Sequence, residues 1–208
     1  MPMSELQNFR QWGSATPGHP EYEIERGIET TTGPLGQGIS NSVGMAMAAK
    51  RIAALFNRPG FDLIDHDIFV IASDGDLMEG VSHETCSLAG HLGLDNLTVI
   101  YDDNHISIEG DTALAYSDDV ALRFEGYGWF VQRIDGHDHQ AIIEALDNAK
   151  AETQRPSIIL ARTHIANGAP TKHDTAGAHG EPLGEDEIRA AKKLVGWPED
   201  AHFLVPDE

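Results

Sequence analysis

The chain has 208 residues, of which 40% are hydrophobic, and its 34 acidic residues outnumber 14 basic ones. This length suits one globular domain with its own core. The formal charge of −20 opposes binding to nucleic-acid backbones and to anionic membranes, so we expect neither as a partner.

The cysteine content and the hydropathy pattern favour a reducing, water-filled compartment. Cys86 is the sole cysteine, so it cannot form an internal disulfide. It falls within an expected helix, where a small core residue is a commoner role than a catalytic thiolate. The sequence shows no signal peptide and no apolar run of about 18 residues. We therefore expect a cytoplasmic protein.

The first part of the chain predicts a turn-rich region followed by a long helix. Residues 4–12 are helix-like, and residues 30–38 form a glycine-rich loop. Residues 40–56 predict a helix, which Ser40 or Ser42 is able to cap. Its apolar face is expected to include Val43, Met47, Ala54 and Leu55.

From residue 68 onward, short apolar segments alternate with helical patterns. Strands that alternate with helices indicate a parallel sheet with right-handed crossovers. We predict an α/β fold in which a parallel sheet is flanked by helices on both faces, and a loop over residues 163–184. The expected strands are 68–72, 97–101, 129–134 and 157–161. The expected helices are 82–92, 118–126, 139–152 and 185–195.

Two polar residues follow two of these strands at the point where each strand ends. Asp74 comes shortly after strand 68–72, and Asn104 comes shortly after strand 97–101. If these strands are parallel neighbours, both side chains reach the same sheet edge, where open α/β sheets bind ligands. A carboxylate and a carboxamide oxygen suit a hard cation, and Mg²⁺ completes its shell with water and ligand phosphate. The spacing therefore predicts a divalent ion that holds a diphosphate cofactor.

Two nearby patterns have plainer interpretations. The loop at residues 33–38 precedes a helix N-terminus, which favours anions, but it matches neither a Walker loop nor the dinucleotide pattern. Taken alone, the loop is better explained as a structural turn. Asp74, Asp76 and Glu79 do not form an EF-hand calcium loop, because Glu79 stands where that loop requires glycine.

Histidine occurs 11 times, mostly in expected loops, where exposure to solvent or hydrogen bonding is its ordinary role. His19 is flanked by glycine and proline, and His179 by alanine and glycine. Small or rigid neighbours suit a side chain that points into a cleft. Zinc is not expected, because no H-x-x-x-H pair or cysteine cluster occurs.

Further segments form a joint pattern that is more specific than any one of them. The segments are Thr16–Glu21, Thr31–Ser40, Asp74–Gly80, Ser87–His91, Val99–Asn104, Ile106–Asp111 and His179–Gly184. With this pattern, the chain resembles the N-terminal thiamine-diphosphate-binding domain of transketolase over essentially its whole length. Deoxyxylulose-phosphate synthases and keto-acid dehydrogenase E1 components share the metal motif, but not the intervening segments.

The resemblance implies thiamine diphosphate bound through Mg²⁺ or Ca²⁺. Asp74, Asn104 and the backbone carbonyl of Ile106 match the metal ligands of the family. His19 and His179 match active-site histidines, where an imidazole exchanges protons with substrate hydroxyls. The remaining matches are the cofactor-contacting Gly33, Leu35, Gly75, Asn104 and His179, and Glu79 at the subunit interface.

The implied reaction moves a two-carbon ketol unit from a ketose phosphate to an aldose phosphate. The resemblance further implies that residues 1–208 are one such domain, incomplete at its N-terminus, with Ser73 at a position that is glycine in the family. Residues 196–208 would begin the linker to a pyrimidine-binding domain, which supplies an essential glutamate. Activity would then need a partner subunit or domain of that kind, in a homo- or hetero-oligomer.

Two other functions stay open on the sequence. The absence of the first strands would expose a sheet edge, as in a truncated, non-catalytic module that binds cofactor or serves assembly. The third hypothesis is another thiamine-diphosphate enzyme, such as a deoxyxylulose-phosphate synthase or a keto-acid dehydrogenase subunit. Pyruvate tested against ketose phosphates as the donor separates this hypothesis from the first.

Overall fold

The structure, a computed structural model, describes residues 1–206. The chain divides into two compact units, one formed by residues 34–163 and the other by residues 1–33 together with the residues from 164 onward. Residues 207–208 of the expected linker lie outside the described residues. Between residues 1 and 206, no helix has both the length and the apolar character that crossing a bilayer requires.

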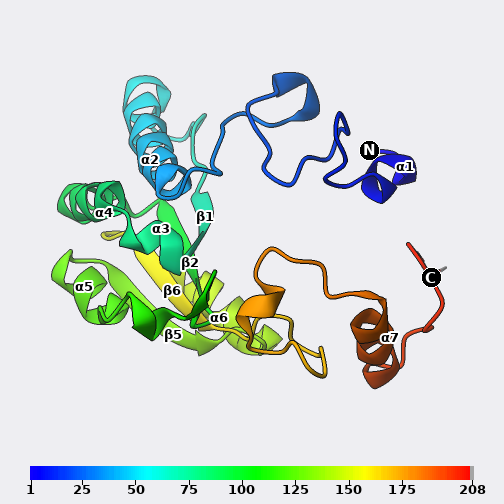
Figure 1. The fold of residues 1–208 in the computed structure, drawn as a ribbon. Helices are drawn as coiled ribbons and strands as arrows, with labels where there is room; N and C mark the ends of the chain where they lie inside the picture. The colour runs from blue at the N-terminus through cyan, green and yellow to red at the C-terminus, as the bar shows by residue number, and fades with distance from the viewer. Residues whose placement is uncertain (207–208) are drawn as a thin grey trace. The chain divides into compact units, whose positions relative to one another are not determined.

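The larger unit is built on a four-stranded parallel sheet (Figure 1). Its register places Ser73 beside Asp102, and Asp103 beside Arg162. The carboxyl ends of these three strands therefore lie level along one edge of the sheet, as the sequence predicted for the first two. In spatial order the strands are β1 (Ile68–Ser73), β2 (Leu97–Asp103), β6 (Ser157–Arg162) and β5 (Phe130–Asp135).

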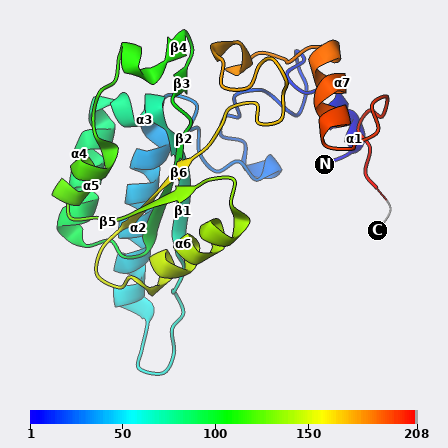
Figure 2. The same ribbon diagram turned by 90° about the horizontal axis from the view of Figure 1, so that it is seen from below.

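Helices cover both faces of this sheet, which confirms the predicted fold class (Figure 2). On one face, three helices pack over buried strand residues that include Val99 and Tyr101. On the other face, a single helix packs over Ile100 and Ile159. Two cores result because successive side chains of a strand point to opposite faces. The first three helices are α2 (Gln37–Phe56), α4 (Gly80–Leu92) and α5 (Val120–Gly126), and the fourth is α6 (His139–Ala151).

The second face is covered over only part of its width. Phe69 and Ile71 of the edge strand β1 are 48% and 75% exposed. Val70 and Ala72, which alternate with them, pack in the larger core. An exposed apolar strand face of this kind is a common site of contact with further protein.

The start of α2 differs from the serine cap that the sequence suggested. Gly36 is the N-cap residue, with φ 79°, and the helix begins at Gln37. The hydroxyls of Ser40 and Ser42 instead donate to the carbonyls of Gly36 and Ile39. The predicted cap was wrong because a serine hydroxyl also bonds to the preceding helical turn.

The expected apolar face of α2 is buried at only one of its four predicted positions. Val43 is 2% exposed, whereas Met47, Ala54 and Leu55 are exposed. Small residues take most of the buried positions, which lets the helix approach the sheet closely. The buried residues of α2 are Ile39, Ser42, Val43, Ala46 and Ala49.

The smaller unit has few regular elements. Its α-helices are the short α1 (Met3–Gln7), which covers only the first part of the expected helix, and α7 (Glu185–Leu194). Glu187 of α7 accepts hydrogen bonds from the backbone N–H groups of Thr171 and Lys172. The bond from Thr171 is the main cause that holds the pKa of Glu187 below its ordinary value. These bonds attach the preceding loop to α7.

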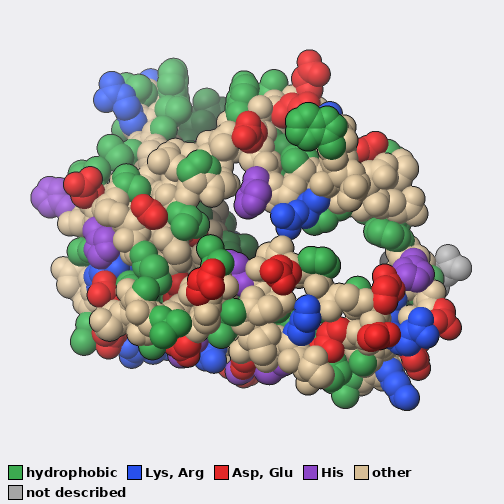
Figure 3. All heavy atoms as spheres, viewed as in Figure 1, with side chains coloured by type: hydrophobic (Ala, Val, Ile, Leu, Met, Phe, Trp, Pro, Cys, Tyr) green, Lys and Arg blue, Asp and Glu red, His purple; other side chains and the backbone are tan. Residues whose placement is uncertain are grey.

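The molecular surface carries the acidic excess of the sequence. On the face shown in Figure 3, Asp and Glu side chains are spread over many elements and do not gather in one patch. This distribution agrees with the 34 acidic residues being dispersed along the chain. A dispersed acidic surface of this kind is well solvated.

Candidate cation and cofactor site

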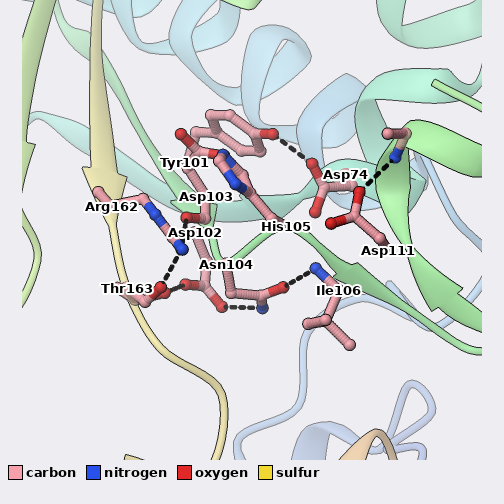
Figure 4. A network of polar contacts seen from close by, with 11 residues as sticks. Asp74, Tyr101, Asp102, Asp103, Asn104, His105, Ile106, Asp111, Arg162 and Thr163 are labelled. Atoms are coloured by element: carbon pink, nitrogen blue, oxygen red, sulfur yellow. Dashed lines mark hydrogen bonds and ion pairs between the residues drawn. The ribbon is translucent and has the colours of Figure 1, made fainter. Parts of the chain in front are cut away.

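Asp74 stands where a strand passes directly into a helix. The strand β1 ends at Ser73, and α3 (Asp74–Met78) begins at the next residue. The Asp74 side chain is buried, with 4% exposure. Its carboxylate accepts a hydrogen bond from the hydroxyl of Tyr101 on the neighbouring strand β2 (Figure 4). The sheet and α3 together therefore fix the position of this carboxylate.

The charge around Asp74 favours a bound cation. Burial raises the pKa of Asp74 above its ordinary value, the bond from Tyr101 lowers it, and the nearby Asp103 carboxylate raises it again. Asp102 adds a smaller effect in the same direction as Asp103. A divalent ion removes this penalty, because it stabilises the ionised form of a buried carboxylate. A buried carboxylate with a second carboxylate close by thus suits a hard cation.

Asn104 shapes the turn that follows β2. Its amide nitrogen donates to the Asp102 carboxylate at 3.1 Å, and its oxygen accepts the backbone N–H of Ile106 at 2.8 Å. His105, between them, has φ 62°. The turn brings Asn104 and Ile106 to the same sheet edge as Asp74 (Figure 4). The carboxamide oxygen keeps a second lone pair for a ligand.

The end of β6 supports this turn from the other side. Arg162 donates to the backbone carbonyl of Asp103 at 2.9 Å. The hydroxyl of Thr163 donates to the carboxylate of Asp102, which also accepts the Asn104 amide. Asp102 therefore has a structural role: it connects two strand ends. Sequence reasoning missed Arg162 and Thr163, because the order of strands in the sheet cannot be read from local patterns.

The glycine loop is joined to α3 through Asp76. One Asp76 carboxylate oxygen accepts the backbone N–H of Gly36, and the other accepts that of Ser73, both at 3.0 Å. Leu35 lies against Gly75, where an added Cβ would come within 3.1 Å of the Leu35 side chain. Asp76 was missed as a positioning residue. Its signal was a serine followed three residues later by an acidic residue, which is a capping-box pattern.

A cavity of about 390 Å³ opens beside Asp74. Its lining includes five aspartates against one arginine, together with the half-buried Tyr116. Burial raises the pKa of Tyr116 to about 12, so this hydroxyl stays protonated at neutral pH. The acidic lining favours cations over anions. The lining includes Asp74, Asp103, Asp111, Tyr116, Asp118 and Arg133.

The two candidate active-site histidines belong to the smaller unit, where both are exposed. An added Cβ at Gly33 would lie 3.7 Å from the His19 ring nitrogen Nδ1. Arg10 is in contact with both histidine-bearing segments. Its side chain packs on the glycine before His19, and its guanidinium donates to the carbonyl of the residue after His179 at 3.3 Å. Sequence reasoning did not single out Arg10.

Glu79 and Cys86 differ sharply in their surroundings. Glu79 lies at the junction of α3 and α4 and is exposed. Cys86 is 1% exposed in the larger core, and burial raises the pKa of its thiol to about 12. This confirms the expected core role of Cys86, since a protonated buried thiol is a poor nucleophile.

The parallel sheet, with acidic residues and a glycine loop at the carboxyl ends of its strands, defines an α/β domain of the cofactor-binding class. A family model described as the thiamine diphosphate binding domain of transketolase matches residues 1–208. The chain therefore belongs to this family.

Individual transketolases are similar over nearly the whole of this chain. Transketolase 1 of Vibrio cholerae is 56% identical over 205 residues, which are 98% of this chain and 31% of that protein. A solved transketolase from Leishmania mexicana has a TM-score of 0.95 at 44% identity, covering 99% of this chain and 31% of its own. A Pichia stipitis transketolase solved with sedoheptulose-7-phosphate has a TM-score of 0.94 at 44% identity, with the same coverage. The chain spans about a third of the length of the relatives it matches.

Proposed function

We propose that this chain is the cofactor-binding part of a transketolase, which transfers a two-carbon ketol unit from a ketose phosphate to an aldose phosphate. The observation that carries the proposal is the buried Asp74 carboxylate, which lines one cavity together with Asp103, in a chain of the thiamine-diphosphate-binding family. The sedoheptulose-7-phosphate complex of the Pichia stipitis enzyme supports sugar phosphates as substrates.

In this proposal, Asp74, the Asn104 side-chain oxygen and the Ile106 carbonyl hold Mg²⁺ or Ca²⁺. These are hard oxygen ligands, and such ions share their shell with ligand phosphate oxygens. The ion also offsets the charge of the buried Asp74. Asn104 thereby serves both the ion and the diphosphate.

The cofactor would rest against Gly33, Leu35 and Gly75. Glycine at position 75 lets the backbone approach a ligand closely, and Leu35 packs on it. When bound, thiamine diphosphate supplies a nucleophilic carbon and an electron sink. The loop at Leu35 is fixed through the hydrogen bond between its neighbour Gly36 and Asp76.

His19 and His179 are the residues that we assign to proton transfer at substrate hydroxyls. Near neutral pH, an imidazole either donates or accepts a proton, and both rings are exposed for contact. His179 would contact the cofactor as well. Arg10 would position the two rings, because it contacts a residue adjacent to each of them.

Catalysis also needs a pyrimidine-binding domain or subunit of transketolase, in a homo- or hetero-oligomer. Glu79, which is exposed here, would lie at the subunit interface. The exposed Phe69 and Ile71 offer additional apolar surface for assembly. We place the whole enzyme in the cytoplasm.

Calorimetric titration of the chain with thiamine diphosphate in Mg²⁺ tests the proposal. We expect saturable binding that disappears when Mg²⁺ is chelated and in Asp74→Ala. Asp147→Ala removes an exposed carboxylate on α6 and should bind like the native chain. Circular dichroism establishes that each variant is folded.

A folded native chain that binds no cofactor would refute autonomous binding. Titration after addition of a pyrimidine-domain partner then separates a site completed by assembly from one that has lost its function. Ketol transfer from a ketose phosphate, measured against pyruvate as donor, distinguishes transketolase from the other thiamine-diphosphate enzymes.

A further inference from the structure

Two histidines and one aspartate meet in a loop of the smaller unit, and none of the three is among the residues assigned to the cofactor. His164 Nδ1 lies 2.7 Å from Asp174 Oδ2, and His173 Nε2 lies 3.4 Å from the same oxygen. The imidazole rings stack, with centroids 5.0 Å apart and planes at 22°. One ligand atom from each of the three residues lies within 4.8 Å of the other two.

We propose that His164, His173 and Asp174 bind a first-row divalent ion, and that Zn²⁺ fits them best. Two imidazole nitrogens and a carboxylate oxygen form a ligand set that zinc uses, whereas Mg²⁺ prefers oxygen alone. The cluster thus differs in chemistry from the all-oxygen site at Asp74. The cluster would bind an ion that cross-links the two ends of the loop, and it would take no part in the ketol transfer.

The distances suit this ion. Ligand atoms around tetrahedral zinc, with bonds of about 2.0–2.1 Å, lie about 3.3 Å apart. The 3.4 Å separation of His173 and Asp174 already matches this value. The 2.7 Å contact of His164 is a direct hydrogen bond that an ion would replace. The three side chains are 35–40% exposed, so they have room to rotate, and water can take a fourth position.

The backbone, rather than sequence spacing, brings these residues together. Asp174 has φ 53°, and its N–H donates to the carbonyl of Ile165 at 3.1 Å. This bond returns the chain to the start of the loop beside His164. Most residues other than glycine disfavour this left-handed conformation, and aspartate is one of the few that tolerate it. The sequence spacing did not indicate this cluster, because its members come from the two ends of a closed loop.

A bound ion would cross-link residue 164 to residues 173–174. It would therefore restrict the loop that leads toward His179. Since the unfolded chain lacks this arrangement, binding should stabilise the folded unit by mass action.

Co²⁺ is the probe for the experiment, since its absorption reports four-coordinate geometry and Zn²⁺ displaces it. The full chain is titrated with Co²⁺ in excess Mg²⁺, which occupies the oxygen site at Asp74. We expect one equivalent to saturate and Zn²⁺ to abolish the signal. His173→Gln and Asp174→Asn should each weaken affinity about tenfold or more. Asparagine tolerates the left-handed backbone at position 174, so that variant should keep the loop intact.

His202→Gln is the matched control, because His202 is an exposed histidine of the same unit outside the cluster. It should bind Co²⁺ like the native chain. Native affinity in folded His173→Gln and Asp174→Asn would overturn the proposal. An equal loss in His202→Gln, or no saturable binding by the native chain, would overturn it as well.

Discussion

Asp74 carries opposing demands of stability and ligand binding in a single side chain. Its pKa is raised in the folded chain, chiefly by burial, so the folded state holds the proton more tightly than the unfolded state. The resulting stability is present below the ordinary pKa of 3.8 and is lost as pH rises through the raised value. At neutral pH, the ionised carboxylate therefore destabilises the ion-free chain.

Asp74→Asn should separate these two effects. The amide is neutral and still accepts the bond from Tyr101, so we expect the ion-free variant to gain about 1 kcal/mol at pH 7. That gain corresponds to a melting temperature higher by about 2–4 °C. Mg²⁺ with thiamine diphosphate should raise the melting temperature of the native chain and leave that of the variant unchanged. Thermal unfolding measured with and without both ligands checks this; a destabilised ion-free variant would contradict it.

At the scale of single residues, the sequence was sufficient for Asp74 and Asn104 to be expected together, because each follows an apolar strand. The parallel register of β1 and β2 confirms that their strand ends are level. It was insufficient for Thr163, whose contact with Asp102 depends on β6 lying beside β2. Nor did it reveal the cluster around Asp174, which depends on a left-handed backbone. Local sequence patterns therefore predict where strands end, but they do not predict the order of strands in the sheet or the way a loop closes.

At the scale of elements, Gly36 sets the entry into α2. It has φ 79°, and an added Cβ would lie 2.9 Å from both the Glu79 Cβ and the Val81 side chain. Gly36→Ala should therefore destabilise the chain by about 2 kcal/mol or more. Gly44 lies within α2 with open space around it, so Gly44→Ala should stabilise by about 0.5–1 kcal/mol. Urea unfolding measures both; equal effects of the two substitutions would contradict this account.

The start of α6 gives a second prediction at this scale. The Asp138 side chain accepts hydrogen bonds from the backbone N–H groups of Gln140 and Ala141. Asp138→Ala removes this cap and should cost about 1 kcal/mol. Asp147→Ala removes the same charge from an exposed position within the helix and should change stability by about 0.5 kcal/mol or less. Chemical denaturation of the two variants decides between loss of a cap and loss of charge.

Element types were predictable where the apolar period was clear, while their ends were less so. The sheet strands were expected close to their observed positions, since each is a short apolar run. The beginning of α2 was misplaced because its N-cap residue is Gly36, and a glycine has no side chain that marks a cap in the sequence. The backbone N–H of Gly36 is held instead by the Asp76 carboxylate. Exposed residues such as Met47 and Leu55 also make this helix look more apolar on its outer side than a solvated helix would be.

For the whole molecule, the charge of −20 dominates the long-range electrostatics. Self-repulsion destabilises a compact acidic chain, and salt screens it. We expect the melting temperature to rise by several degrees between low salt and about 0.5 M NaCl, where the Debye length is a few ångströms. Tetramethylammonium chloride should have a similar effect if screening is the cause. A rise seen with NaCl alone would indicate cation binding, and no rise would contradict the prediction.

The division of the molecule into two units was not visible in the sequence, which showed no clear boundary. The smaller unit combines residues 1–33 with the residues from 164 onward, so its parts are distant in sequence. Local composition gives no sign of such a pairing. The resemblance to transketolase did carry information at this scale, because its segments extend across both units.

Because β1 passes directly into α3, no flexible loop adjoins Asp74. With no loop residue between the two elements, this carboxylate moves only when the sheet edge or α3 moves. Local opening usually begins in weakly packed loops. We therefore expect slow hydrogen exchange at the Asp74 junction, and faster exchange at the turn that carries Asn104. Opening of the ion site would then begin at the turn that carries Asn104. Asp74 would keep its position until the end of β1 or α3 itself unfolds.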